Sequence, residues 1–109
     1  RFHGRLAIDA NYNGLALDHG EGERIARAMG AADVCFLGNH GVIVGGARID
    51  HAYDDLYYLE RACMAQVIAQ STGQPLMPVA DELAARVAAQ TLGERLQSEL
   101  FFEALRRTL

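Results

Sequence analysis

The chain has 109 residues, half of them hydrophobic and 22% charged, which leaves room for one hydrophobic core and is typical of a soluble globular protein rather than a disordered one. Ten basic residues, all arginine, stand against fourteen acidic ones, and the net charge of −4 argues against a nucleic-acid partner, whose phosphates require clustered positive charge. No apolar run approaches the ~20 residues of a membrane span and the N-terminus has no signal-peptide pattern, so we expect no membrane partner and a cytoplasmic location.

Other features of the composition limit the chemistry of the chain. Without lysine, this segment has no amine for a Schiff base and no P-loop lysine for a nucleotide phosphate. Cys35 and Cys63 lie in apolar patterns and lack the spacing of a zinc ribbon or a redox pair, which favours free thiols over a disulfide. The chain begins at Arg1 without a methionine and ends at Leu109 within a helical pattern, which indicates a piece of a longer protein.

The first half of the chain predicts short strands separated by turns. The apolar segments that we interpret as strands are 5–9, 15–17, 33–38 and 42–46. A turn is expected at 11–14, because Asn and Gly tolerate the positive φ that turns require. Asp18 is placed to cap a helix that Gly30 ends. The last two apolar segments have no polar face, so we expect other layers to cover them.

The second half predicts helices. The longest spans 50–72, where apolar residues recur at helical spacing, and Asp50 is expected to cap it. Residues 74–79 contain both prolines and predict a linker. A helix capped by Asp81 follows. Gly93 either ends this helix or joins it to a last helix.

The polar and aromatic side chains of the long helix are expected to have ordinary structural roles. The carboxylates of Asp54, Asp55 and Glu60 are expected to face solvent or to interact electrostatically with the helix end. Tyr53, Tyr57 and Tyr58 lie on different sides of the helix, so at least one of them is expected at the surface or at an interface. The purely structural interpretation is that Tyr53 and Tyr57 pack in the core.

Asn39-His40-Gly41, between the two later apolar segments, predicts a tight turn. A three-residue hairpin loop commonly needs a left-handed residue at its end, and Gly41 supplies one. Two interpretations of His40 stay open at this point. It is a tolerated turn residue, or the rigid hairpin tip presents it beyond the sheet edge as a metal ligand.

A catalytic zinc usually takes three protein ligands, so the other histidines matter. His3, His19 and His51 are not at a chelating spacing from one another. His51 is expected to be solvent-exposed at a helix start, and we do not expect His3 or His19 to be ligands. The residues alone therefore supply one candidate ligand.

Two segments in combination resemble a known family. The sequence VCFLGNHGVIVGG at 34–46, followed by HAYDDLYYLERA at 51–62, resembles the second half of the class II aldolase/adducin domain. The segments 14–18 and 21–30 are also similar, so the resemblance extends over about residues 4–73. Asn-His-Gly alone would be a weak signal, whereas its position between apolar strands and before this helix is specific.

The resemblance implies an α/β fold. Its architecture would be an α/β/α layered domain around a mixed, largely antiparallel sheet, present here as a C-terminal fragment. Residues 1–74 would be the C-terminal half of that domain and residues 75–109 a C-terminal helical tail. Several family members form fourfold tetramers with sites near the subunit interfaces, so a homo-oligomer is expected.

The resemblance also implies a function: a zinc-dependent aldolase or epimerase that acts on a small, phosphorylated sugar and stabilises a carbonyl or enediolate with the metal. By motif position, His40 corresponds to the third zinc ligand. The other two ligands, a His-x-His pair, and the acid/base glutamate would precede Arg1, so no catalytic residue is assigned and the isolated piece is expected to be inactive. Manganese or cobalt is the alternative to zinc.

A second function stays open, an adducin-like head domain that keeps the fold without the metal and serves as an interaction module. A His-x-His pair before Arg1 would favour the enzyme, and its absence would favour the interaction module. The presence of His40 favours the enzyme, because a turn needs Gly41 more than it needs a histidine.

Overall fold

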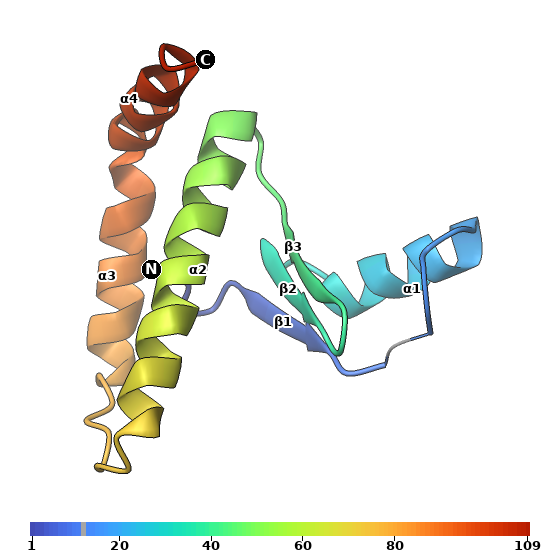
Figure 1. Cartoon of the computed structure of the whole chain (residues 1–109), viewed down its shortest axis with the longest axis horizontal. Coiled ribbons are helices and arrows are strands. Elements are labelled where there is room, and N and C mark those ends of the chain that lie inside the picture. Colours follow the sequence, from blue (N-terminus) through green and yellow to red (C-terminus); the bar gives the residue numbers. More distant parts are fainter. Residues whose placement is uncertain (12) are drawn as a thin grey trace. The chain divides into compact units, whose positions relative to one another are not determined.

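The computed structural model describes residues 1–11 and 13–109, which divide into two units (Figure 1). The strand unit comprises residues 4–45, and the helical unit comprises residues 1–3 and 46–109. Together the described residues form three strands and four helices, which confirms the predicted α/β class. In the described part of the chain, no helix is both long and apolar enough to cross a membrane.

The strand unit contains a mixed sheet in the order β1-β2-β3. Its strands are β1 (Leu6–Asp9), β2 (Val34–Leu37) and β3 (Gly41–Val44). The ladder between β1 and β2 is parallel, and the ladder between β2 and β3 is antiparallel. The central strand contains Val34 and Cys35, both fully buried. The mixed sheet agrees with the prediction, and the apolar composition of β2 follows from its central place.

Helix α1 (His19–Met29) connects the parallel strands and packs on β1 and β2. The Asp18 carboxylate accepts a hydrogen bond of 2.8 Å from the backbone N–H of Glu21, which confirms the predicted cap. Gly30 ends the helix with a φ of +55°, where a side chain would be strained.

The segment before this helix differs from the prediction. Residues 15–17 form no strand; the N–H of Leu17 donates to the carbonyl of Leu15 in a tight turn, and both side chains are exposed. Apolar composition was a misleading signal there, because these residues have no neighbouring strand to pair with. The turn expected at 11–14 includes residue 12, which lies outside the described residues.

The β2–β3 hairpin positions His40. Leu37 pairs with Gly41, so the loop consists of residues 38–40, and the N–H of His40 donates to the carbonyl of Leu37 at 3.1 Å. Gly41 has a positive φ of +153°, which a residue with a Cβ rarely adopts, and Asn39 also has a positive φ, of +57°, which asparagine tolerates at the third position of a turn. Glycine also suits position 38, since a Cβ there would lie 3.1 Å from the carbonyl oxygen of Ala10, a tight contact.

The helical unit consists of α2 (Ile49–Ser71), α3 (Asp81–Gly93) and α4 (Arg95–Arg106), with the predicted linker before α3 (Figure 1). Helix α4 packs on α2 through aromatic rings. The ring centroid of Tyr53 lies 5.5 Å from that of Phe102, and the centroid of Tyr57 lies 5.2 Å from that of Phe101. Both tyrosines remain 38–39% exposed, so they line the edge of this interface rather than a core.

The helix starts lie slightly earlier than predicted. Arg48 and Ala80 occupy the N-cap positions, and neither makes a capping hydrogen bond through its side chain. Asp50 and Asp81 instead lie in the first turns, where a carboxylate still interacts favourably with the helix dipole.

Asp50 makes an ion pair that predicts a pH dependence. Hydrogen bonds of 3.0 and 2.5 Å from Arg48 lower the pKa of Asp50 to about 2 from its usual 3.8. Since the folded-state pKa is the lower one, the stabilisation is complete above about pH 5 and is lost as the pH falls from about 4 toward 2. We expect Asp50→Asn to lower the urea midpoint at neutral pH, with a difference from the unsubstituted chain that shrinks over that range. A constant difference would contradict this role.

Candidate functional site

A cavity of about 190 Å³ in the strand unit lies beside His40. Among the described residues, its polar lining consists of Asp9, Asn11, Asn13, Glu21, Arg24 and His40. Its apolar lining includes Ile25, Leu37, Val42 and Ile43. The end of β1, the loop after it, helix α1 and the β2–β3 hairpin thus converge on one hollow with a few polar groups, as small-molecule sites commonly do.

Arg24 organises the charged wall of this cavity. Its Nε and Nη2 lie 2.9 and 2.7 Å from the two carboxylate oxygens of Glu21, and its Nη1 lies 2.7 Å from Oδ2 of Asp9. Nη2 also donates to the backbone carbonyl of Asn11 at 3.1 Å. The wall is therefore held by a single guanidinium that joins α1 to the end of β1.

These contacts favour the charged forms of Glu21 and Arg24. The hydrogen bond from Arg24 lowers the pKa of Glu21, and the hydrogen bonds to Glu21 and then Asp9 raise the pKa of Arg24. Asp9 is buried, with a side chain that is 3% exposed, and its Oδ1 accepts a hydrogen bond of 3.1 Å from the N–H of Asn11. Two carboxylates and one guanidinium give this wall a formal charge of −1.

Sequence reasoning placed His40 but missed Asp9, Glu21 and Arg24. Glu21 and Arg24 are three residues apart on one face of α1, a spacing that permits an ion pair. Asp9 is the last residue of β1. The carboxylate at a strand end and the Glu-x-x-Arg spacing were visible in the sequence, but nothing in it indicated that they meet.

The structure assigns the other histidines to different places. His3 and His51 belong to the helical unit, and His19 is exposed at the start of α1. His51 was expected to be solvent-exposed, yet its side chain is only 19% exposed and its Nε2 lies 3.2 Å from Oε1 of Glu99. That expectation was wrong because α4 packs over the start of α2.

The imidazole of His40 is a suitable ligand for zinc and similar metals. Within residues 1–11 and 13–109, however, no group of three His, Cys, Asp or Glu side chains is arranged to hold a metal ion. The described residues therefore fit a metal site as the source of one ligand and do not form a complete site.

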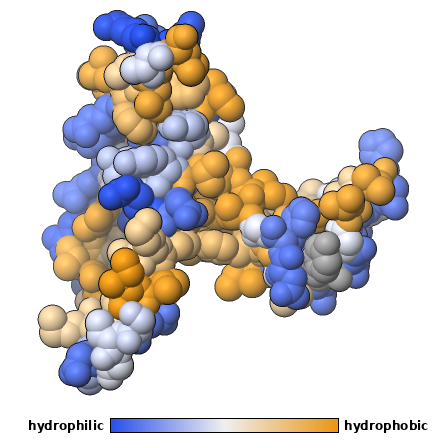
Figure 2. Space-filling model, in the orientation of Figure 1, coloured by the Kyte–Doolittle hydropathy of each residue, from blue (hydrophilic) through white to orange (hydrophobic). Residues whose placement is uncertain are grey.

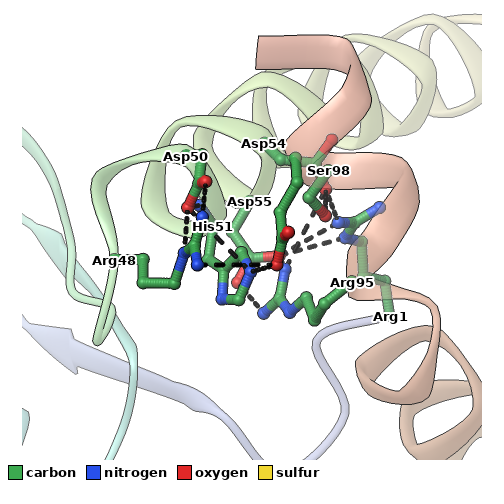
Figure 3. Close-up of polar contacts among 9 residues, drawn as sticks. Arg1, Arg48, Asp50, His51, Asp54, Asp55, Arg95 and Ser98 are labelled. Carbon is green, nitrogen blue, oxygen red and sulfur yellow. Dashed lines mark hydrogen bonds and ion pairs between the residues drawn. The ribbon is translucent and has the colours of Figure 1, made fainter. Parts of the chain in front are cut away.

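The helical unit contains a separate buried ionic cluster, which consists of Arg1, Asp54, Asp55, Arg95 and Ser98 (Figure 3). Arg95 binds both carboxylate oxygens of Asp55, at 3.0 and 2.7 Å. Arg1 contacts both aspartates, and the Ser98 hydroxyl donates to Asp54 at 2.8 Å.

The prediction that Asp54 and Asp55 face solvent was wrong, since they are only 4% and 1% exposed. Two arginines from distant parts of the chain compensate the two buried charges, and helix packing removes them from water. The exposed Glu60 does face solvent as expected.

Comparison with known proteins decides the family. The family model described as Class II Aldolase and Adducin N-terminal domain matches residues 1–67. The chain belongs to the class II aldolase and adducin family. The His40 hairpin of this class II aldolase family member and residues 51–62 of the helix after it lie within the matched region, so the recognition made from these segments is confirmed.

Curated relatives of this family member agree with the assignment. A putative aldolase class 2 protein of Pseudomonas aeruginosa is 36% identical over 74 residues, 68% of this chain and 29% of the relative. A similarly named protein of Caulobacter vibrioides is 35% identical over 76% of the chain and 32% of its own length. Decarboxylase NovR of Streptomyces niveus is 32% identical over 83% of the chain and 31% of its own length. The chain thus spans about a third of these relatives.

A solved structure supports the fold of the class II aldolase family member. The crystal structure of an aldolase II superfamily protein from Pseudomonas syringae has a TM-score of 0.80 and 36% identity. The similarity covers 98% of this chain and 43% of that protein. At this identity and coverage, the fold class inferred from the sequence is confirmed.

Proposed function

We propose that the protein carrying this chain is a metal-dependent enzyme of the class II aldolase type, which cleaves or epimerises a small, phosphorylated sugar derivative. The observation that carries the proposal is the position of His40, at the tip of a hydrogen-bonded hairpin and on the wall of a polar cavity. A turn tip does not require histidine, whereas a rigidly held imidazole is well suited to bind a metal. We propose the cytoplasm as its location.

His40 would contribute one metal ligand, and zinc is our first choice of metal. When bound, a divalent metal supplies Lewis-acid stabilisation of negative charge that develops on substrate oxygen. We propose that the further ligands and the acid/base residue lie outside this chain, in the other two thirds of a protein as long as the curated relatives. The role of this chain is then to hold the imidazole still and to form one wall of the substrate cavity.

Removal of the imidazole tests the proposal. We expect the whole protein to contain about one zinc per chain. His40→Ala should lower that content by more than about tenfold, because loss of even a group that hydrogen-bonds to a metal ligand lowers metal affinity roughly 10–100-fold. The measurement is zinc per protein by mass spectrometry after dialysis. His19→Ala is the matched control, since His19 is exposed and lies in the same unit without lining the cavity. Full zinc retention in His40→Ala would exclude the assignment, and no zinc in the unsubstituted protein would favour an adducin-like interaction module.

Decarboxylation is a second candidate reaction, because Decarboxylase NovR is 32% identical over 83% of the chain. Cleavage of a carbon–carbon bond next to a carbonyl leaves negative charge on carbon in either reaction, so one site can serve both. Release of carbon dioxide rather than of an aldehyde would distinguish the decarboxylase from the aldolase.

We also propose that the protein forms a homo-oligomer. Helix α2 exposes apolar side chains at Met64, Val67 and Ile68, which are 51%, 64% and 59% exposed, and hydrophobic surface is visible on the helical unit in Figure 2. Apolar surface of this kind is typical of interaction sites. Sedimentation equilibrium of the same preparations measures the number of subunits.

A further inference from the structure

His51 lies where helix α4 packs on the start of α2 (Figure 3). Its side chain is 19% exposed, and its Nε2 lies 3.2 Å from Oε1 of Glu99 on α4. The same nitrogen lies 3.9 Å from Oδ1 of Asp50. This contact belongs to the helical unit rather than to the strand unit that contains His40, so the proposed function does not use it.

The charges around the imidazole balance when the ring is protonated. Among the described residues, the charged groups that face it are the carboxylates of Asp50 and Glu99 and the guanidinium of Arg48, whose Nη1 lies 3.8 Å from Oε1 of Glu99. These three groups carry a formal charge of −1, which an imidazolium brings to zero. One turn away, Asp55 and Arg95 bind each other and add no net charge. The positive end of α2 opposes an imidazolium, but its charge of about one half is smaller than this −1.

A second polar attachment holds α4 on α2 one turn away from His51. It consists of the bidentate pair between Arg95 and Asp55 and the hydrogen bond from the Ser98 hydroxyl to Asp54. Arginine and aspartate side chains ordinarily keep their charges between about pH 5 and 8, whereas histidine changes its charge in that range. Among the described residues of this helix contact, His51 is therefore the group whose interaction changes with pH near neutrality.

We infer that His51 makes the attachment of α4 to α2 sensitive to pH near neutrality. The protonated ring donates a charge-assisted hydrogen bond to Glu99, which is roughly twice as strong as the neutral one that the ring can still donate without its extra proton. The added stabilisation is complete at pH values below the range in which histidine titrates, and it is lost as the pH rises through that range. Loosening of α4 uncovers the Phe101 ring that packs on Tyr57, so apolar surface of the helical unit becomes more exposed as the pH rises.

Amide hydrogen exchange of α4 in the whole protein tests the inference, because it reports local opening of a helix. His51→Gln keeps a neutral side chain that can donate to Glu99 and removes the titrating ring. Compared at equal pH, the α4 amides should exchange about fivefold faster in the variant at about pH 5.5 and at nearly the same rate at about pH 8. Equal ratios at the two pH values would overturn the inference, since a purely structural role of the ring does not depend on its charge.

Glu99→Gln is the second variant. The pH dependence of α4 exchange should disappear in it, because the imidazolium has lost its carboxylate partner on α4, and persistence would contradict the inference. Glu103→Gln is the matched control, since it neutralises a carboxylate one turn along the same helix that pairs with Arg107. His3→Gln is the control for loss of a histidine, because His3 is exposed in the same unit. Both controls should keep the pH dependence of the unsubstituted protein.

The unsubstituted protein gives a measurement that needs no variant. When exchange is divided by the intrinsic rate at each pH, protection of the α4 amides should be about fivefold higher at about pH 5.5 than at about pH 8. Equal protection at both pH values would also overturn the inference. The metal content of the protein does not enter this measurement, so its outcome is independent of the proposed function.

Discussion

Asp55→Ala is expected to lower the free energy of unfolding of the helical unit by about 3–5 kcal/mol, the usual cost of breaking a buried ion pair from one side. The Asp55 side chain is 2% exposed and accepts both hydrogen bonds of Arg95, whose own side chain is 18% exposed. Removal of the carboxylate leaves the Arg95 guanidinium largely buried without its bidentate partner. Urea denaturation followed by far-UV circular dichroism measures the change.

Two further variants make the Asp55 result interpretable. Glu60→Ala removes an exposed carboxylate from the same helix and should change stability by less than about 0.5 kcal/mol. Replacement of Asp55 and Arg95 together by apolar residues should restore much of the loss, because a buried pair is often no more stabilising than apolar packing. A loss in Asp55→Ala no larger than that of Glu60→Ala would show that the cluster does not hold α4 on α2.

Arg24→Ala is the change with the largest expected effect in the strand unit. The Asp9 side chain is 3% exposed and lies 2.7 Å from Arg24, so the substitution leaves a buried carboxylate without its cation. We expect a loss of about 2–4 kcal/mol in the free energy of unfolding, measured by the same denaturation experiment. Because Arg24 also holds Glu21, the cavity wall should loosen together with the contact between α1 and β1.

Arg27→Ala is the control for that experiment. Arg27 is one turn further along α1, and its side chain and that of its partner Glu23 are 70% and 69% exposed, so the expected loss is below about 0.5 kcal/mol. Equal losses in the two arginine variants would contradict a special role for the Asp9–Arg24 contact. The Asp9→Asn variant gives a second check, since it neutralises the buried charge and should reduce the effect of Arg24→Ala.

Local signals predicted much of the strand unit. Asp18 and Gly30 mark the ends of α1, because capping and left-handed backbone depend on residues that are neighbours in sequence. The same holds for the hairpin that presents His40, where Asn39 and Gly41 both have a positive φ. The failed strand at 15–17 shows the limit of such signals, since a strand needs a partner that apolar composition does not specify.

The sequence alone therefore determined the hairpin, the position of His40 in it and the family that the combination of motifs indicates. Only the tertiary structure decided the surroundings of these residues. Asp55 is joined to Arg1 and Arg95 across 54 and 40 positions of sequence, and such long-range pairing turns carboxylates that look solvent-facing into buried ones. Asp9 and Arg24 meet because α1 folds back on β1. The sequence predicted His40 as a single candidate ligand, and the tertiary structure places it beside a cavity with a charged wall.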